Sequence, residues 1–347
     1  MLIAAALIVG LAHHAEESTP RQLRALVTEY DHPRDALEVM LVRGDGQIFA
    51  ALARDPSLSH PEVFRYGSFD AAYRAQRPLL GYLSWALSGG DPTRVPMAMA
   101  ILAVLGAGLA TGTLAGFLTR PWLALLIVPS PAGLAVLYSL TPELLALGLA
   151  LAGVLAWQRD KRYLAIACFT LAGLGRESML LFPAACAAAE VVGRRRPPGA
   201  LAIPFATWLG WAALAHARFG EPLWPLSAGG DLGAPFAEMF RQLDRWEPMD
   251  VLTVVLAGAA TAAAAVAVRR RRDGLLPWAG LAFAAFATLL GASIWAQWFN
   301  SARLLLPLYA AGLAAVYGRE PDRGSARPGD ETRWVGGTTV ESGRSSA

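Results

Sequence analysis

The chain has 347 residues, of which 55% are hydrophobic and 16% are charged, and its formal net charge is +3. Soluble domains carry about a quarter of their residues as charged side chains, so this composition excludes an ordinary soluble protein. The mean hydropathy of +0.40 and apolar blocks of about 20 residues predict an integral membrane protein that crosses the lipid bilayer as helices. The positive charge lies in arginine clusters between these blocks, so it predicts topology and no nucleic-acid partner.

The apolar blocks predict an all-α fold, a polytopic transmembrane bundle of about 8 to 10 membrane segments. We expect one transmembrane domain over residues 1–317, with extracytoplasmic loops at 13–77 and 218–250. Residues 318–347 are rich in Gly, Ser, Arg and Asp and predict a disordered C-terminal tail. Cys168 and Cys186 both lie in apolar blocks, where packing is the expected role rather than a disulfide or a metal site.

The N-terminal region begins with a short apolar stretch, Met1 to Ala12, which reads either as a retained first membrane helix or as the core of a signal peptide. We favour the helix, because no basic residues precede the stretch. Residues 21–30 predict an amphipathic surface helix, and residues 36–54 repeat that pattern around Asp45. Asp55 and Pro56 are expected to end it. The adjacent His13 and His14 are expected to be solvated rather than to bind a ligand.

The membrane blocks follow in order and are separated by charged or proline-rich breaks. They cover residues 78–88, 95–118, 121–140, 144–157, 163–174, 179–192, 201–217, 251–268, 275–298 and 304–317. Pro129 and Pro131 predict a kink inside the block at 121–140. The block at 78–88 is too short for a crossing and is the one we expect not to span.

Arginine clusters at 159–162, 194–196 and 269–272 orient the chain, because such clusters favour the cytoplasmic side. The opposite, extracytoplasmic face then receives Glu143, Arg176, Glu177, the loop at 218–250 and Arg303. If the block at 78–88 does not span, Asp45 lies on the same face. Ionisable groups gathered at one face of a membrane protein indicate a functional site.

Asp45 stands between two glycines, where the backbone lets a ligand approach closely. Its carboxylate would suit a general base or a ligand for a divalent cation. The alternative role is structural, because an aspartate before an apolar helix is often its N-cap.

The other candidates are arginines and acids near block ends. Arg74, Gln76 and Arg77 precede the block at 78–88, and guanidinium groups bind phosphate through paired hydrogen bonds, although snorkelling toward lipid headgroups is the alternative. Arg176 and Glu177 could simply neutralise each other. Glu143 could serve only as a first-turn helix acid, whereas Arg303 matches the helix dipole poorly and indicates a bound anion.

These motifs resemble the GT-C superfamily of polytopic membrane glycosyltransferases, in particular bacterial family-39-like and mannosyltransferase-like proteins. The similar segments are Gly44-Asp45-Gly46 with residues 48–56, residues 74–78, Thr141-Pro142-Glu143, residues 175–178 and residues 300–303 with Pro307. The family often has a second acid beside the first, and here Gly46 and Gln47 occupy that place.

The resemblance implies an inverting glycosyltransferase of the inner or plasma membrane, working at its extracytoplasmic face. Its donor would be a sugar linked to polyprenyl phosphate and its acceptor an unspecified glycan, lipid or protein. Asp45 would be the general base, and the other candidates would bind substrate or phosphate. These are Arg74, Gln76, Arg77, Glu143, Arg176, Glu177 and Arg303. No cofactor is expected, although a divalent cation stays open. The alternatives are a flippase for a lipid-linked intermediate and a non-catalytic envelope scaffold.

Overall fold

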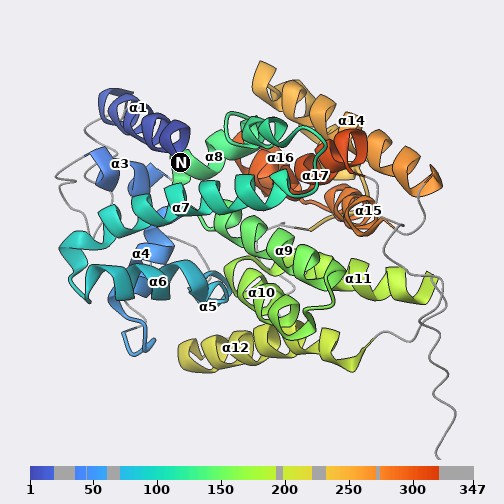
Figure 1. The fold of residues 1–347 in the computed structure, drawn as a ribbon. Helices are drawn as coiled ribbons and strands as arrows, with labels where there is room; N and C mark the ends of the chain where they lie inside the picture. Colours follow the sequence, from blue (N-terminus) through green and yellow to red (C-terminus); the bar gives the residue numbers. More distant parts are fainter. Residues whose placement is uncertain are drawn as a thin grey trace, which may run out of the picture.

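The computed structural model of the protein describes residues 1–18, 36–43, 45–60, 71–192, 198–220, 232–270 and 274–319. Within these ranges every regular element is a helix, which confirms the predicted all-α class. Figure 1 shows the helices packed against one another in a single bundle. Several of them are long and apolar enough to cross a bilayer, so the chain is a helical membrane protein.

Four helices of the described chain meet the length and apolarity needed for a crossing. They are η2 with α7 (Pro92–Ala115), η5 with α12 (Gly199–Phe219), α14 (Pro248–Arg270) and α17 (Trp298–Tyr317). A fifth crossing results if η3 (Pro121–Ile127) and α8 (Pro131–Ser139), which are bent by 57°, form one span. The break lies where the two prolines predict it, with Ser130 capping α8.

Shorter helices complete the bundle. They are α1 (Leu2–Ser18), α9 (Glu143–Gln158), α10 (Arg162–Gly175), η4 (Glu177–Leu180), α11 (Leu181–Val192) and α15 (Leu275–Thr288). With 16 residues, α9 is about 24 Å long, which is less than a hydrocarbon core of about 30 Å. The described residues therefore support four or five spans, and the larger predicted number of segments stays a prediction.

Small helices precede α7, lie between α12 and α14, or connect α15 to α17. They are α3 (Ala36–Arg43), α4 (Gly46–Arg54), α5 (Ala71–Ala75), α6 (Pro78–Ser88), α13 (Ala237–Arg241), η6 (Leu243–Arg245) and α16 (Ala292–Trp295). As expected, α6 is not among the candidate spans, and α4 ends at Arg54, directly before Asp55.

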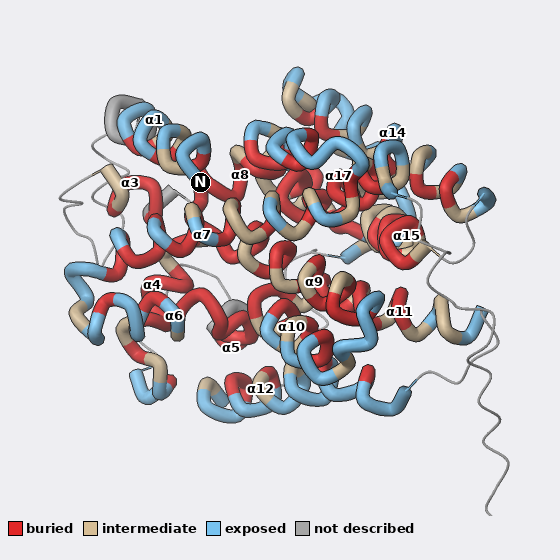
Figure 2. Tube along the Cα trace, in the orientation of Figure 1, coloured by how far each residue is buried: buried red, intermediate tan, exposed pale blue. Residues whose placement is uncertain are grey.

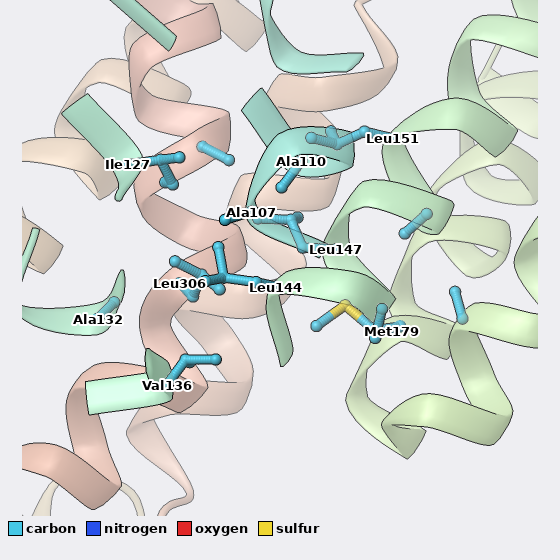
Figure 3. Close-up of a cluster of buried hydrophobic side chains, with 14 of the residues drawn as sticks. Ala107, Ala110, Ile127, Ala132, Val136, Leu144, Leu147, Leu151, Met179 and Leu306 are labelled. Atoms are coloured by element: carbon cyan, nitrogen blue, oxygen red, sulfur yellow. The ribbon is translucent and has the colours of Figure 1, made fainter. Parts of the chain in front are cut away.

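Helix α9 lies at the centre of the bundle and is buried along most of its length (Figures 1 and 2). Leu144, Leu147 and Leu151 face the core beside residues of α7, α8 and α17 (Figure 3). A Cβ atom on Gly148 would lie 2.8 Å from the backbone nitrogen of Ala110, so glycine permits the close approach of α7 and α9. By contrast, the outer faces of α12 and α14 are largely exposed, as helices in contact with lipid would be (Figure 2).

The helices give the bundle two distinct ends. Helices α7 and α9 run in the same direction, because Gly106 packs on Leu145 and Gly148 on Ala110. Helices α14 and α17 also run in the same direction, because the hydroxyl of Tyr309 donates to the carbonyl of Thr253 and Gly312 packs on Ala260. The last turns of these four helices meet around a cavity of about 70 Å³ whose lining includes Phe117, Gln158, Ala267 and Gly318. We call this end the arginine end, because Arg159, Arg162, Arg269, Arg270 and Arg319 lie at it.

Predicted boundaries are wrong at the C-terminal end of the bundle. The last block is predicted to begin at residue 304, but α17 begins at Trp298 and therefore includes Asn300 and Arg303. The block at 275–298 is not one helix, because α15 ends at Thr288 and the chain resumes in α16 after an extended Gly291. Leu290 forms an isolated bridge with Leu232 at this break. Apolar composition alone does not reveal such an interruption. The predicted surface helix at 21–30 and the predicted tail beyond Arg319 lie outside the described residues.

Candidate functional site

Six charged side chains from distant parts of the chain gather at the end of the bundle opposite the arginine end. We call them the charged network: Asp45, Arg77, Glu143, Arg176, Glu177 and Arg303. Antiparallel pairing of α9 with α10 explains part of this arrangement, because the start of α9 and the end of α10 must then lie together. The starts of α4, α6 and α17 supply the remaining members.

Asp45 forms an ion pair with Arg303, in which the Nη2 group of Arg303 donates to the Oδ2 atom of Asp45. Arg303 lies in the second turn of α17 and is buried, with 6% of its side chain exposed, whereas Asp45 keeps 19% exposure. The same Nη2 group donates to the Oδ1 atom of Asn300 at 2.9 Å. The ion pair therefore holds the Asp45 carboxylate in a fixed position that stays partly accessible.

Arg77 and Glu177 form the second pair, which is bidentate. The Nε and Nη2 groups of Arg77 donate to the two oxygens of Glu177, each at 2.7 Å. Arg77 also donates to the hydroxyl of Tyr73 at 3.0 Å and lies over its ring. Two parallel hydrogen bonds between a guanidinium and a carboxylate are among the strongest polar contacts in proteins. Arg77 is 3% exposed and Glu177 is 27% exposed, so this pair also keeps its carboxylate nearer to solvent.

Arg176 and Glu143 form the third pair, which is looser. The Nη1 atom of Arg176 lies 3.5 Å from the Oε1 atom of Glu143, and its Nε atom lies 3.9 Å from the Oε1 atom of Glu177. Glu143 is only 1% exposed, and neither of its oxygens has a hydrogen-bond partner among the described residues. Buried polar groups in proteins are normally hydrogen-bonded, so this pair is the unsatisfied part of the network.

The pKa shifts show that the pairs influence one another. Burial raises the pKa of Glu177, but the charges of Arg77 and Arg176 and the hydrogen bonds from Arg77 outweigh it and lower the pKa to about 2. Burial, followed by the charge of Arg77, lowers the pKa of Arg176. Arg77 behaves in the opposite way, because the charge of Glu177 overcomes burial and raises its pKa well above the ordinary value. The charge of Arg303 also lowers the pKa of Arg176, so Arg176 lies close enough to both other arginines to be repelled by them.

Two predicted site residues are not brought into this network. The side-chain amide nitrogen of Gln76 lies 2.7 Å from the Nε2 atom of His216, a buried residue of α12, so Gln76 turns away from the carboxylates. Arg74 belongs to α5, and its side chain lies outside the described part of the structure.

The structure decides against two of the simpler interpretations. Asp45 occupies the N-cap position of α4, yet its side chain makes no capping hydrogen bond and turns to Arg303 instead. Arg176 and Glu177 do not simply neutralise each other, because Glu177 makes its short hydrogen bonds to Arg77. Glu143 does lie in the first turn of α9, where an acid complements the helix dipole, but it also faces Arg176.

Two residues that are not among the predicted site residues, Tyr73 and Asn300, also contact the network. Tyr73 precedes Arg77 by four positions, and Asn300 precedes Arg303 by three. Residues three or four positions apart lie on one side of a helix, so this spacing is the signal that identifies them. Both residues support an arginine, and neither carries a charge at neutral pH.

Two apolar grooves lie on the sides of the bundle. One of about 510 Å³ is bordered by α1, α3 and α7, and one of about 420 Å³ is bordered by η3, α14 and α17. Neither is lined by a member of the charged network. Within the described ranges no three His, Cys, Asp or Glu side chains are arranged to hold a metal ion.

No family model matches the chain, and no curated protein or solved structure is similar to it at a significant level.

Proposed function

We propose that the protein is a membrane glycosyltransferase that moves a sugar from a polyprenyl-phosphate-linked donor to an acceptor hydroxyl. One observation carries the proposal most directly. The Asp45 carboxylate makes no capping hydrogen bond to α4. It is held instead by a buried arginine, and 19% of the Asp45 side chain stays exposed. A fixed, charged and accessible carboxylate beside several guanidiniums is what base-assisted transfer from a phosphate ester requires.

The chemistry that we assign to these groups is a single displacement. The acceptor oxygen attacks the anomeric carbon of the sugar, and the bond from that carbon to the phosphate oxygen breaks. Asp45 takes the proton of the acceptor hydroxyl, and the electron pair of the broken bond remains on the phosphate. Guanidiniums of the network stabilise the negative charge that grows on this leaving group.

The bundle supplies the setting for a lipid-linked donor. Apolar grooves of about 510 and 420 Å³ on its sides offer room for a hydrocarbon chain. The arginine clusters at the ends of α9 and α14 lie away from the network. By the positive-inside rule the network faces the extracytoplasmic side, where the lipid-linked donor would meet its acceptor.

The test is a transfer assay with the purified protein in proteoliposomes. Donors would be polyprenyl-phosphate-linked hexoses, and the sugar released or transferred would be measured by mass spectrometry. We expect Asp45→Asn to lower turnover by a factor of about 10² to 10⁴, as loss of a general base does, while the protein stays folded. Asp91→Asn, which alters an exposed carboxylate that caps η2, is the matched control.

Unchanged turnover in Asp45→Asn would remove Asp45 from the mechanism. A flippase for the same intermediate gives a different result, because the donor would move between leaflets while its sugar-phosphate bond stayed intact. Following donor position and donor hydrolysis in the same vesicles separates the two functions.

A further inference from the structure

The hydrogen bonds of the charged network are unevenly distributed among its arginines. Arg77 uses two of its donor groups on Glu177 and Tyr73, and Arg303 uses its Nη2 group on Asp45 and Asn300. The guanidinium of Arg176 makes no hydrogen bond to a described residue, and its contacts to Glu143 and Glu177 are ion pairs at 3.5 and 3.9 Å. A guanidinium carries five N–H donors, so Arg176 has the largest unused donor capacity in the network.

Burial of Arg176 makes its missing hydrogen bonds energetically unfavourable. Arg176 has 6% of its side chain exposed, and leaving a buried charged group without hydrogen bonds costs free energy. Its Nε atom is buried and unpaired, as are both oxygens of Glu143 and the Nε atom of Arg303, but Arg303 still uses its Nη2 group in two hydrogen bonds. Glu143 supplies the counter-charge that lets a third arginine lie beside Arg77 and Arg303, but it does not satisfy the donors of Arg176.

We propose that Arg176 is the residue that binds a phosphoryl group, whereas Arg77 and Arg303 mainly hold the carboxylates of Glu177 and Asp45. This assignment rests on the proposed function for the identity of the lipid-linked donor. That the ligand is an anion follows from the unused hydrogen-bond donors of Arg176. The phosphodiester of a lipid-linked sugar offers only acceptor oxygens at neutral pH, and a guanidinium can bind two phosphoryl oxygens with parallel hydrogen bonds.

The local field also favours an anion. The three carboxylates and three guanidiniums of the network balance in formal charge. Helices α4, α6 and α9 begin at the network, and α8 and α10 end there. Each helix N-terminus contributes the equivalent of roughly half a positive charge and each C-terminus roughly half a negative charge. The helix ends therefore add positive charge on balance, and a phosphate would accept the hydrogen bonds that the guanidinium of Arg176 has left to donate.

The experiment measures phosphate binding to the full-length protein in detergent micelles, with no transfer reaction involved. One arm titrates polyprenyl phosphate in mixed micelles and the other titrates inorganic phosphate, each followed by the shift in thermal unfolding temperature. We expect Arg176→Lys, which keeps the charge but loses the planar fork, to weaken binding at least tenfold. Arg176→Gln should remove binding. If the binding of inorganic phosphate depends on Arg176 as the binding of polyprenyl phosphate does, the protein recognises the phosphoryl group alone. If only the binding of polyprenyl phosphate depends on Arg176, the protein recognises a lipid headgroup.

Two comparison variants make the outcome decisive. The loss of phosphate affinity in Arg77→Lys should be at least five times smaller than the loss in Arg176→Lys, because the donors of Arg77 already bind Glu177. Arg162→Lys alters an arginine at the arginine end that pairs with Asp160, and it should leave binding unchanged. Equal losses in the Arg77 and Arg176 variants, or binding insensitive to Arg176, would overturn the assignment. If the protein transfers sugar but its phosphate binding does not depend on Arg176, the assignment of Arg176 is overturned and the proposed function stands. If phosphate binding depends on Arg176 but no sugar is transferred, the assignment stands and the proposed function is overturned.

Discussion

Gly46 packs directly against the backbone of Ser139, so that a Cβ atom at position 46 would lie 2.6 Å from the Ser139 carbonyl oxygen. This contact places the start of α4 against the end of α8, and Asp45 is the residue immediately before it. A backbone oxygen cannot move aside as the tip of a side chain can. The absence of a side chain at position 46 therefore helps to fix where the Asp45 carboxylate lies.

Gly46→Ala is expected to displace the start of α4 and, with it, Asp45. Overpacking against a backbone costs about 1–3 kcal/mol of unfolding free energy. A displaced general base should lower the turnover number by roughly tenfold to a hundredfold. Unfolding by detergent titration and the transfer assay measure the two effects. Gly112→Ala is the matched control, because a Cβ atom there meets open space, and it should stabilise α7 by up to about 1 kcal/mol. Equal behaviour of the two variants would show that the contact at Gly46 is unimportant.

The ion pair between Asp45 and Arg303 should show strong energetic coupling. Arg303 is buried, so removing its partner leaves a desolvated charge, and removing both partners avoids that penalty. In a double-mutant cycle of Asp45→Asn and Arg303→Gln, we expect a coupling free energy of at least about 1 kcal/mol. The measurement is the unfolding free energy of the four proteins in mixed micelles.

The exposed pair of Arg162 and Asp160 supplies the reference cycle. Its coupling should fall between about 0 and 1 kcal/mol, because solvent screens exposed charges. A coupling for Asp45 and Arg303 no larger than this would mean that the pair does not hold the carboxylate in place.

Glu177 should make the stability of the protein depend on acid pH. Its pKa is lowered from an ordinary value of 4.5 to about 2 in the folded protein, so the folded state binds a proton less readily than the unfolded state. The stabilising contribution is complete above about pH 5 and is lost as the pH falls toward about 2. Allowing for the partial exposure of Glu177, we expect it to amount to about 2 kcal/mol.

Thermal unfolding measured between pH 2 and pH 7 tests this dependence. Glu177→Gln should flatten the acid limb and should lower stability at neutral pH, because Arg77 loses its bidentate partner. Glu190→Gln is the control, since its contact with Arg162 is long, at 3.7 Å, and that variant should keep the acid limb. An unaltered limb in Glu177→Gln would assign the acid sensitivity to other carboxylates.

Local sequence signals predicted helix bounds and bends well where these features depend on residues close together in the chain. The bounds of α6 match the predicted block at 78–88, and Pro129 and Pro131 marked the bend before α8. The break after α15 was missed, because Gly291 lies in an apolar run and the bridge from Leu290 to Leu232 is a long-range contact. Length and hydropathy cannot show such a contact.

All six members of the charged network were among the eight predicted site residues, but Gln76 is not part of the network and the pairing of the charges was not predicted. Counting charged groups at block ends placed Asp45, Glu143 and Arg303 at one end of the bundle, because helix direction follows from the order of the blocks. Which arginine meets which carboxylate depends on side-chain packing between helices that are far apart in sequence. Gln76 illustrates this limit, since its contact with His216 depends on how α12 packs against α5.

The orientation of the bundle supplies the last prediction. Glu247 is exposed just before α14, at the end that carries the network, and Asp160 is exposed just after α9, at the arginine end. If the arginine end is cytoplasmic, only the first position faces outward. In a background carrying Cys168→Ala and Cys186→Ala, we expect Glu247→Cys to react with a membrane-impermeant thiol reagent in intact cells. Asp160→Cys should react only after the membrane is permeabilised. The reverse labelling pattern would put the charged network on the cytoplasmic side, where an extracytoplasmic acceptor could not reach Asp45.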